Sequence, residues 1–316
     1  MSRLTMLDVA KRRTSSKEVG LIEANLVHAP EVAQFPARTI EGTSYSTLLR
    51  VGLPSVQFTG VNEGVTPSKS RFETKLVQTF PIRSAVEIDK ALISADNPQS
   101  TLMTDESMGV AEAAIRAIGR QIYYGRGTGG DAKGFPGLQD FVDNTMVVNA
   151  TGTTAGTGSS VYFVKFGLKD VQLIFGNGTV LKLPPFRDET LTDANGGKFD
   201  GLISHLTGWA GIQCTNPNSL VRICNLTADN GKGLTDALLA SALAKFPAGV
   251  VPDAIFMTRR SRKQLQDARS ALVALQGNGK SGTLGGGSTY VPTPTDFEGI
   301  PIVATDSLLD TEALVA

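Results

Sequence analysis

Apolar and polar residues alternate over a long stretch of the N-terminal third of the chain. Between residues 71 and 89 (RFETKLVQTFPIRSAVEID) the apolar side chains fall on even positions, namely Phe72, Leu76, Phe80, Ile82, Val86 and Ile88. A period of two predicts a β-strand with one apolar face. Because an extended segment at 45–61 and the turn-rich tip NEGVTPSKS precede this run, we predict a long β element with two limbs.

The length of this element predicts a projection. At about 3.3 Å per residue the return limb spans on the order of 50 to 60 Å, which is longer than strands within a domain normally are. We expect a hairpin that projects and lies on a neighbouring copy; an ordinary bent hairpin within a sandwich is the alternative. The residues that we expect at this contact between subunits are Arg71, Phe72, Lys75, Leu76, Phe80 and Ile82, together with Arg12 and Arg13 near the N-terminus.

A helical period follows the hairpin. Residues Met108, Ala111, Ile115, Ile118 and Ile122 recur at steps of three and four, which predicts an amphipathic helix over 105–124 with Thr104 as its N-cap. Such a helix of about 20 residues is roughly 30 Å long.

The remaining pattern mixes strands and helices. The stretch 161–183 holds two apolar runs joined by Gly-Asn-Gly, which predicts a hairpin, with partner strands near 205–214 and 219–226. A helix is expected over 234–246, a buried strand at 253–258, a helix over 259–275 and a last strand at 299–308. Because helices and strands are segregated and do not strictly alternate, the fold class is α+β.

Two glycine-rich loops imitate nucleotide-binding motifs. GRGTGG (125–130) satisfies G-x-G-x-x-G, and the segment ending in Gly279-Lys280-Ser281 matches the loosest form of a P-loop. Both motifs need a strand before the glycines and a helix after them, because the helix N-terminus holds the phosphates. In each case the predicted helix comes first, so GRGTGG is interpreted as a flexible joint and the second motif as a flexible loop.

The N-terminal segment, residues 1–45, has the composition of a dependent arm. Its first twenty positions hold five Lys or Arg and two acidic residues, and two prolines in HAPEVAQFPART favour an extended path. We expect a neighbouring subunit to hold this arm, because it has little apolar surface of its own. No signal peptide or membrane span is apparent.

Composition and chemistry narrow the functional classes. The 30 basic and 30 acidic residues cancel, which excludes a strong global field for nucleic acid or an anionic membrane. Cys214 and Cys224 lack metal-site spacing and are expected to be free buried thiols; a disulfide between them is the alternative, because they are ten residues apart on strands predicted to be neighbours. His28 and His205 form no recognisable motif, and carboxylate pairs such as those at 105–106 and 188–189 are typical of helix starts and loops. We therefore predict no enzyme, no cofactor and no metal.

Several motifs, in order, resemble the major capsid proteins of tailed phages with the Hong Kong 97-type fold. Tyr123-Tyr124-Gly125 ends the long helix, and Phe135-Pro136-Gly137-Leu138 follows it as in the family's joint. Downstream, Gly211-Ile212 and the strand 220–225 are similar to a strand pair of these proteins. The runs 253–257, with Arg260 and Leu265, and 297–302, with Thr305-Asp306, resemble strands and a helix of the family's axial domain.

The resemblance implies an organisation in five parts. These are an N-terminal arm (1–45), an extended hairpin loop (46–90), a peripheral domain (91–226) with a spine helix (105–124), an axial domain (227–300), and a C-terminal strand (301–316) returning to the peripheral domain. It also implies self-assembly into the hexamers and pentamers of an icosahedral shell around double-stranded DNA, formed in the host cytoplasm and retained in the virion.

The resemblance also suggests partners. A portal, a possible decoration protein and DNA held non-specifically on the inner face are implied, and no membrane. Many relatives carry a long N-terminal segment that is removed on maturation, and the short arm here leads us to expect a separate scaffolding protein. The basic residues at 259–263 are expected to meet an acidic neighbour, the packaged DNA or solvent. The alternative functions are an encapsulin-like nanocompartment shell and, more distantly, a nucleotide-binding enzyme that uses Lys280.

Overall fold

In the computed structural model of the chain, residues 29–95, 99–178, 180–276 and 291–315 are described. The N-terminal half runs through α2 (Glu31–Gln34), β1 (Ala37–Thr39), β2 (Ser44–Gly52), β3 (Arg71–Gln78), β4 (Phe80–Asp89), α3 (Lys90–Ala95), α4 (Gln99–Tyr124), α5 (Leu138–Phe141), η1 (Asn144–Met146) and β5 (Val147–Asn149). Then follow β6 (Ser159–Val164), β7 (Val171–Phe175), β8 (Arg187–Thr192), β9 (Lys198–Cys214), η2 (Pro217–Ser219), β10 (Leu220–Leu226), α6 (Asp236–Leu243), β11 (Ala254–Met257), α7 (Arg259–Gln276), β12 (Asp296–Phe297) and β13 (Ile300–Ala304).

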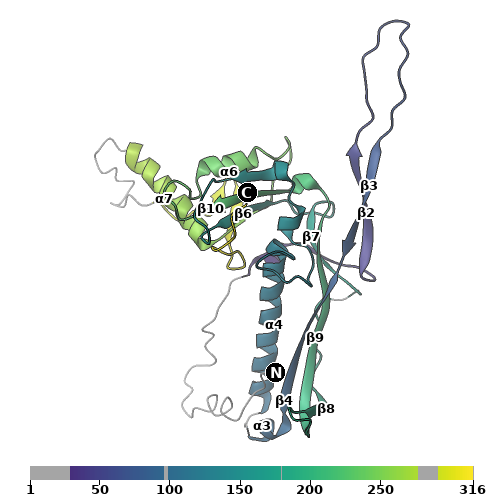
Figure 1. The fold of residues 1–316 in the computed structure, drawn as a ribbon, viewed down its shortest axis with the longest axis vertical. Helices are drawn as coiled ribbons and strands as arrows, with labels where there is room; N and C mark the ends of the chain where they lie inside the picture. Colours follow the sequence, from purple (N-terminus) through teal and green to yellow (C-terminus); the bar gives the residue numbers. More distant parts are fainter. Residues whose placement is uncertain (1–28, 96–98, 179, 277–290, 316) are drawn as a thin grey trace.

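The strands form three sheets. A five-stranded sheet has the order β1-β7-β9-β4 with β8 also on β9, a six-stranded sheet has the order β12-β13-β11-β6-β10-β5, and β2 pairs only with β3. Helix α4 runs beside β4 and β9 along a narrow limb, the six-stranded sheet with α6 and α7 lies at one end of that limb, and the β2–β3 hairpin projects past the same end (Figure 1). Mixed strands and helices arranged in this way confirm the α+β class.

The six-stranded sheet has a core on each face. In β6, Tyr162 and Val164 belong to the cluster that also contains the end of α4, whereas Val161 and Phe163 belong to the cluster beneath α6 and α7. Successive side chains of a strand point to opposite faces. Every position of β6, β10 and β11 is buried for this reason, and most of these positions hold apolar residues; Ser159, Ser160, Arg222 and Asn225 are the polar exceptions.

The alternating run at 71–89 is two strands and not one. Strand β3 pairs with β2 from Ser44↔Gln78 onward, and β4 pairs with β9 over ten positions from Phe80↔Ala210. At the break, Thr79 donates from its backbone N–H (2.8 Å) and its Oγ1 (3.0 Å) to the carbonyl of Thr43. The predicted projection is therefore correct, but its paired limb is shorter than expected, because the period of two continues unbroken from one sheet into another.

The long helix begins earlier than predicted, and only part of its apolar face is buried. Helix α4 starts at Gln99, so Thr104 lies inside it and is not the N-cap. Ile118 and Ile122 are almost fully buried, whereas Met108 (65% exposed) and Ile115 (41%) are not. Ile118 and Ile122 lie where α4 meets the main core, and the middle of the helix retains an exposed apolar surface.

The Gly-Asn-Gly segment is a turn, but the predicted hairpin is wrong. Asn177 and Gly178 have φ values of 55° and 65°, and their N–H groups donate to the carbonyls of Gly42 and Ile40. The run after the turn forms one bridge, Lys182↔Thr207, and does not return along β7. The predicted partner strands are confirmed, because β7 pairs with β9 and β6 with β10.

The described part of the predicted arm is held by its own chain. Phe35 is 3% exposed and its ring lies 4.9 Å from Phe166 and 5.5 Å from Phe256, centroid to centroid. Strand β1 pairs in parallel with β7. The expectation that a neighbour holds the whole arm is therefore wrong for residues 29–45, and residues 1–28 lie outside the described part.

The GRGTGG loop is tightly packed, so its interpretation as a flexible joint is wrong. A Cβ placed on Gly125, whose φ is +53°, would lie 2.0 Å from the backbone nitrogen of Gly137, and one on Gly130 would lie 2.0 Å from the carbonyl oxygen of Gly125. Contacts this short exclude any side chain. Glycine is needed here because two backbone segments approach each other closely.

The Gln121 side chain closes the same loop. Its Nε2 donates to the carbonyls of Asp131 (3.1 Å) and Phe135 (2.7 Å), and its Oε1 accepts from the N–H of Asp131 (2.8 Å). Helix α4 precedes the loop and α5 starts only at Leu138, so the predicted order of helix then loop is confirmed. The second glycine motif, with Lys280, lies outside the described residues.

Two glycines of α4 make a matched pair for a stability test. A Cβ on Gly109 would meet nothing within 4 Å, whereas one on Gly119 would lie 2.4 Å from Oε1 of the fully buried Glu31 and 2.7 Å from Oγ of Ser307. We predict that Gly109→Ala raises the free energy of unfolding by about 0.5–1 kcal/mol through helix propensity. Gly119→Ala is expected to lower it by about 1–3 kcal/mol through overpacking. Urea unfolding of the unassembled chain measures both, and equal stabilisation would contradict the close approach.

Candidate assembly surfaces

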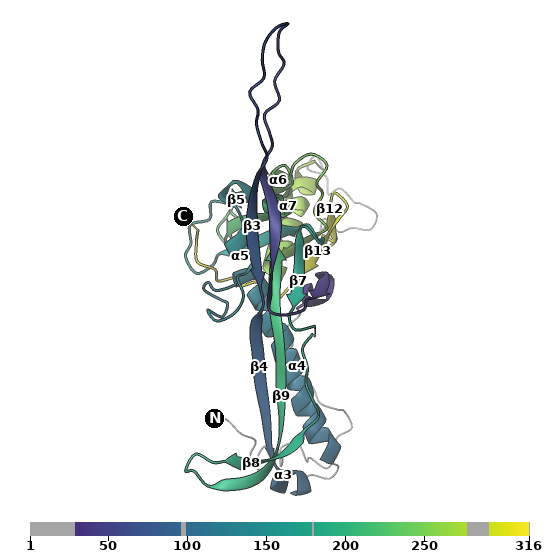
Figure 2. The ribbon, with the colours of Figure 1, turned by 90° about the vertical axis from the view of Figure 1, so that its right-hand side faces the viewer.

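The hairpin exposes apolar side chains that its own chain leaves uncovered. Strands β2 and β3 pair antiparallel, with a bulge between Arg50 and Gly52. Leu48 (68% exposed) and Leu76 (60%) stand on the paired part, and beyond it, in the strand-free tip 53–70, Phe58 is fully exposed (107%). The hairpin stands clear of the sheets and helices in Figure 1, and its tip extends beyond them in Figure 2. A two-stranded hairpin is marginally stable by itself, so such a surface favours a partner.

The base of the hairpin is anchored firmly to the five-stranded sheet. Val77 of β3 packs with Ile40 and Ile174, and Tyr45 of β2 lies against this small cluster. The Tyr45 hydroxyl donates to Oε1 of Gln213, and burial raises the pKa of this hydroxyl. These contacts fix the direction in which the hairpin leaves the body.

Four of the predicted contact residues lie on β3 and are exposed. They are Arg71, Phe72, Lys75 and Leu76. The Arg50 guanidinium carbon lies 5.2 Å from the centre of the Phe72 ring, and Lys75 Nζ lies 3.4 Å from the carbonyl oxygen of Thr215. The structure therefore places all four residues on one projecting strand, with Phe72 and Leu76 on one face and Arg71 and Lys75 on the other. Arg12 and Arg13 lie outside the described residues.

The other two predicted contact residues have a different setting. Phe80 and Ile82 belong to β4, where they are partly buried against the main core. The Arg126 guanidinium carbon lies 4.8 Å from the centre of the Phe80 ring. Their even positions resemble those of Phe72 and Leu76, but the break at Thr79 places them in another sheet.

Sequence reasoning missed the apolar residues of the tip. Val56, Phe58 and Val61 are each at least 94% exposed. Glycine and proline interrupt this stretch, so it shows no periodicity. The only hint in the sequence is that several apolar residues stand close together beside turn-forming residues.

The basic residues at the start of α7 meet acidic residues of the same chain. Arg259 lies 3.9 Å from Asp306, and Arg260 lies 3.3 Å from Asp310 and donates to the carbonyl of Thr157 (2.6 Å). These residues were expected to meet an acidic neighbour, packaged DNA or solvent. Arg259 and Arg260 have acidic partners, and those partners belong to the same subunit. They tie the C-terminal segment to α7.

A buried polar cluster joins the C-terminal segment to α4 and the six-stranded sheet. Glu312 accepts from Tyr124 Oη (2.6 Å) and Ser160 Oγ (2.5 Å), and it pairs with Arg222 at 3.2 Å, with both charged side chains 7% exposed. The Tyr124 hydroxyl also accepts from the N–H of Leu309 (2.7 Å). Burial, followed by the nearby Glu312 carboxylate, raises the pKa of Tyr124 well above its ordinary value, so Tyr124 remains a donor.

The metal-binding and thiol groups of the described residues were candidates for a reactive site. Among the residues that the structure describes, no group of three or more His, Cys, Asp or Glu side chains is placed to hold a metal ion. None of the helices in the described ranges is long and apolar enough to cross a membrane. Cys214 and Cys224 are both buried and free, as predicted. Burial raises the pKa of Cys214 to about 12, so its thiol is inert at neutral pH.

Known structures define the class of fold. A chain of bacteriophage Epsilon15 superposes with a TM-score of 0.75 at 20% identity, covering 100% of this chain and 98% of that one. The capsid of bacteriophage JBD30 gives a TM-score of 0.50 at 12% identity, covering 97% and 99%. An encapsulin from Synechococcus elongatus reaches a TM-score of 0.48 at 7% identity, covering 71% and 97%, which is too distant to support an argument. The fold is the Hong Kong 97 type of tailed-phage capsid proteins.

The sequence itself identifies the family. Residues 37–316 match the family model described as major capsid protein GP7. The chain therefore belongs to this family and is a major capsid protein of a tailed phage, as the resemblance implied. No curated protein matches the chain.

The Glu312 cluster leads to a stability prediction. Glu312→Gln keeps the shape of the side chain but leaves the Arg222 guanidinium buried without a counter-charge, which is expected to cost about 3–5 kcal/mol of unfolding free energy. The matched control is Glu73→Gln, because Glu73 and its partner Arg71 are 53% and 77% exposed and such pairs contribute at most about 1 kcal/mol. Urea unfolding of the unassembled chain measures both, and similar losses for the two variants would contradict a structural role for the buried pair.

Proposed function

We propose that copies of this chain assemble into the hexamers and pentamers of an icosahedral shell that encloses double-stranded DNA. The observation that carries this proposal is the projecting hairpin, whose apolar side chains face solvent on both its paired part and its tip. Monomeric soluble proteins seldom expose such surface, and an exposed apolar patch is typical of an interaction site. Membership in a family of shell-forming proteins supports a second copy of the chain as the partner.

The geometry of the hairpin favours ring-like assembly. It protrudes from one end of the molecule, and we propose that it covers a different surface on its neighbour. A contact between two different surfaces is heterologous, and repeating it by rotation closes a ring. We propose Arg71, Phe72, Lys75 and Leu76 as contacts in this interface, together with the tip and with Arg12 and Arg13; Phe80 and Ile82 support the interface from the core.

The five-part organisation inferred from the sequence also forms part of the proposal. We assign α4 and β9 to the peripheral domain (91–226) and the region of α6 and α7 to the axial domain (227–300), with the arm (1–45), the hairpin loop (46–90, which includes β4) and the C-terminal strand (301–316) attached to them. Strands β10 and β11, one on each side of residue 226, belong to the same sheet. We therefore expect the two domains to move together as one body.

The remaining partners follow from the proposed role. A separate scaffolding protein, a portal and possibly a decoration protein would complete the particle, which forms in the host cytoplasm. The balanced charge of the chain supports weak, non-specific contact with the packaged DNA. The proposed role is structural and requires no catalysis.

Assembly is tested by changing the hairpin alone. We predict that Phe72→Asp with Leu76→Asp abolishes rings and shells, because the interface would then bury two charges in place of two apolar side chains. Leu168→Asp is the control, since Leu168 is 72% exposed but lies outside the hairpin. Light scattering with negative-stain imaging, with and without scaffolding protein, reports particle mass, and circular dichroism reports folding. Normal shells from the folded double variant would refute the proposed interface.

A further inference from the structure

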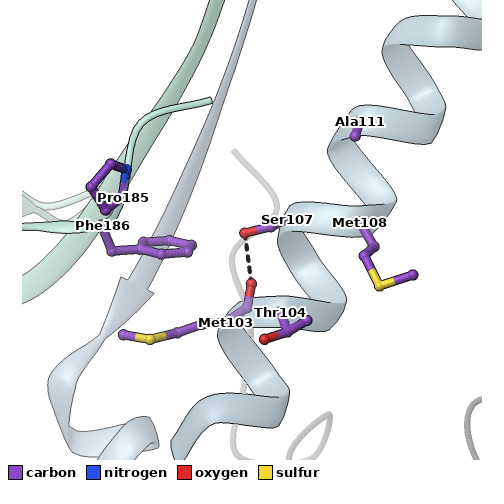
Figure 3. Close-up of a pocket in the computed structure, with 7 residues that line it drawn as sticks. All are labelled: Met103, Thr104, Ser107, Met108, Ala111, Pro185 and Phe186. Carbon is purple, nitrogen blue, oxygen red and sulfur yellow. Dashed lines mark hydrogen bonds between the residues drawn. The ribbon is translucent and has the colours of Figure 1, made fainter. Parts of the chain in front are cut away.

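An apolar groove lies at the N-terminal half of α4, away from the hairpin. Met103, Thr104, Ser107, Met108 and Ala111 of α4 line it together with Pro185 and Phe186, which precede β8, and its volume is about 580 Å³. Phe186 reaches toward Met103, while Met108 projects from the outer side of the helix (Figure 3). Met103 and Phe186 continue into a buried cluster with Val86 and Ile88. The floor of the groove is therefore formed by well-packed side chains, and its outer edge is open to solvent.

An exposed apolar stripe leads from this groove along α4. At 100° per residue, positions 108, 111, 115 and 119 lie within about 80° around the helix axis. Met108 and Ile115 are 65% and 41% exposed, unusually high values for apolar residues on one face of a packed helix. The stripe ends at Gly119, where the described chain begins.

The described part of the chain begins at the end of this stripe. The Cβ atom of Ala29 lies 3.3 Å from the position that a Cβ on Gly119 would occupy. Two residues later, Glu31 is fully buried and accepts from the Thr305 hydroxyl (2.7 Å), which pins the chain at this point. Ala29, the first described residue, thus has a fixed position beside α4.

Residues 18–28 are long enough to reach the groove from Gly119, and their sequence is apolar enough to bind there. Gly119 and Met108 are eleven residues apart, or roughly 16 Å along the helix. Residues 18–28 (EVGLIEANLVH) cover that distance even at a helical rise, and in an extended conformation fewer residues suffice. They contain no Lys or Arg. Besides Ala24, they hold five larger apolar side chains that match the stripe: Val19, Leu21, Ile22, Leu26 and Val27.

We propose that residues 18–28 lie along the Met108–Ile115 stripe of their own subunit and fill the groove beside Phe186. This docking directs residues 1–17, with Arg12 and Arg13, away from the far end of α4 toward a neighbour. The proposal goes beyond the proposed function and does not depend on it, because it concerns a contact within one chain. A neighbouring copy's arm or hairpin in the groove is the competing outcome.

Crosslinking within the unassembled full chain tests the occupant. Met108→Cys is combined in turn with Val19→Cys, Ile22→Cys and Leu26→Cys and treated with a short bis-maleimide at neutral pH, where the buried native thiols do not compete. The control replaces Met108→Cys with Val251→Cys, which is 59% exposed and precedes β11. We expect an intramolecular crosslink to position 108, shown by peptide mass spectrometry on the monomer band, and none to position 251. Crosslinks only between chains, or none at any of the three positions, would overturn the proposal.

Limited proteolysis gives an independent measurement. A protease that cleaves after glutamate has two sites in the segment, Glu18 and Glu23. In the full chain with Met108→Asp and Ile115→Asp, we expect cleavage there to be roughly tenfold faster, the change produced by losing about 1.4 kcal/mol of docking free energy. Val251→Asp is the matched control and should leave the rate unchanged. Unchanged cleavage in the α4 variant would show that the segment does not dock on this stripe.

Discussion

Strand β9 pairs along its length with three other strands, and the projecting parts of the molecule depend on this ladder. Ten residues of β4, five of β7 and six of β8 pair with it. Through β4 it holds the exit of the hairpin, and through β7 it holds β1 and the start of the described chain. A hairpin with no core of its own needs such support, because two strands alone are only marginally stable. The backbone hydrogen bonds of one strand thus set the direction in which an apolar surface is presented.

A second constraint operates where α4 meets the six-stranded sheet. The backbones at Gly125 and Gly137 approach too closely for any side chain, and Glu312 joins Tyr124 to Arg222 in the buried space nearby. Close-packed backbone and a satisfied buried ion pair both resist small displacements. The limb and the sheet are therefore held at a defined angle.

The exposed apolar residues are divided between two separate regions. Those of the hairpin lie on its exposed strands and tip, where we propose contact with a neighbouring subunit, whereas Met108 and Ile115 lie on α4 near Gly119, which Ala29 adjoins. One surface thus suits contact between copies and the other suits a contact within the chain. Since burial of apolar area stabilises any contact that achieves it, position and chain connectivity decide which occupant each surface receives.

The sequence by itself determined the class, the order of elements and the presence of a projecting hairpin, because periodicity and turn residues are local properties. It also placed Arg71, Phe72, Lys75 and Leu76 on one limb. Only the tertiary structure decided where that limb ends, because the alternation passes through Thr79 without change while the hydrogen-bond partner changes from β2 to β9. It likewise decided that the glycines of 125–130 serve close packing and that residues 29–45 belong to the body. These are contacts between segments distant in sequence, and no local pattern of residue types encodes them.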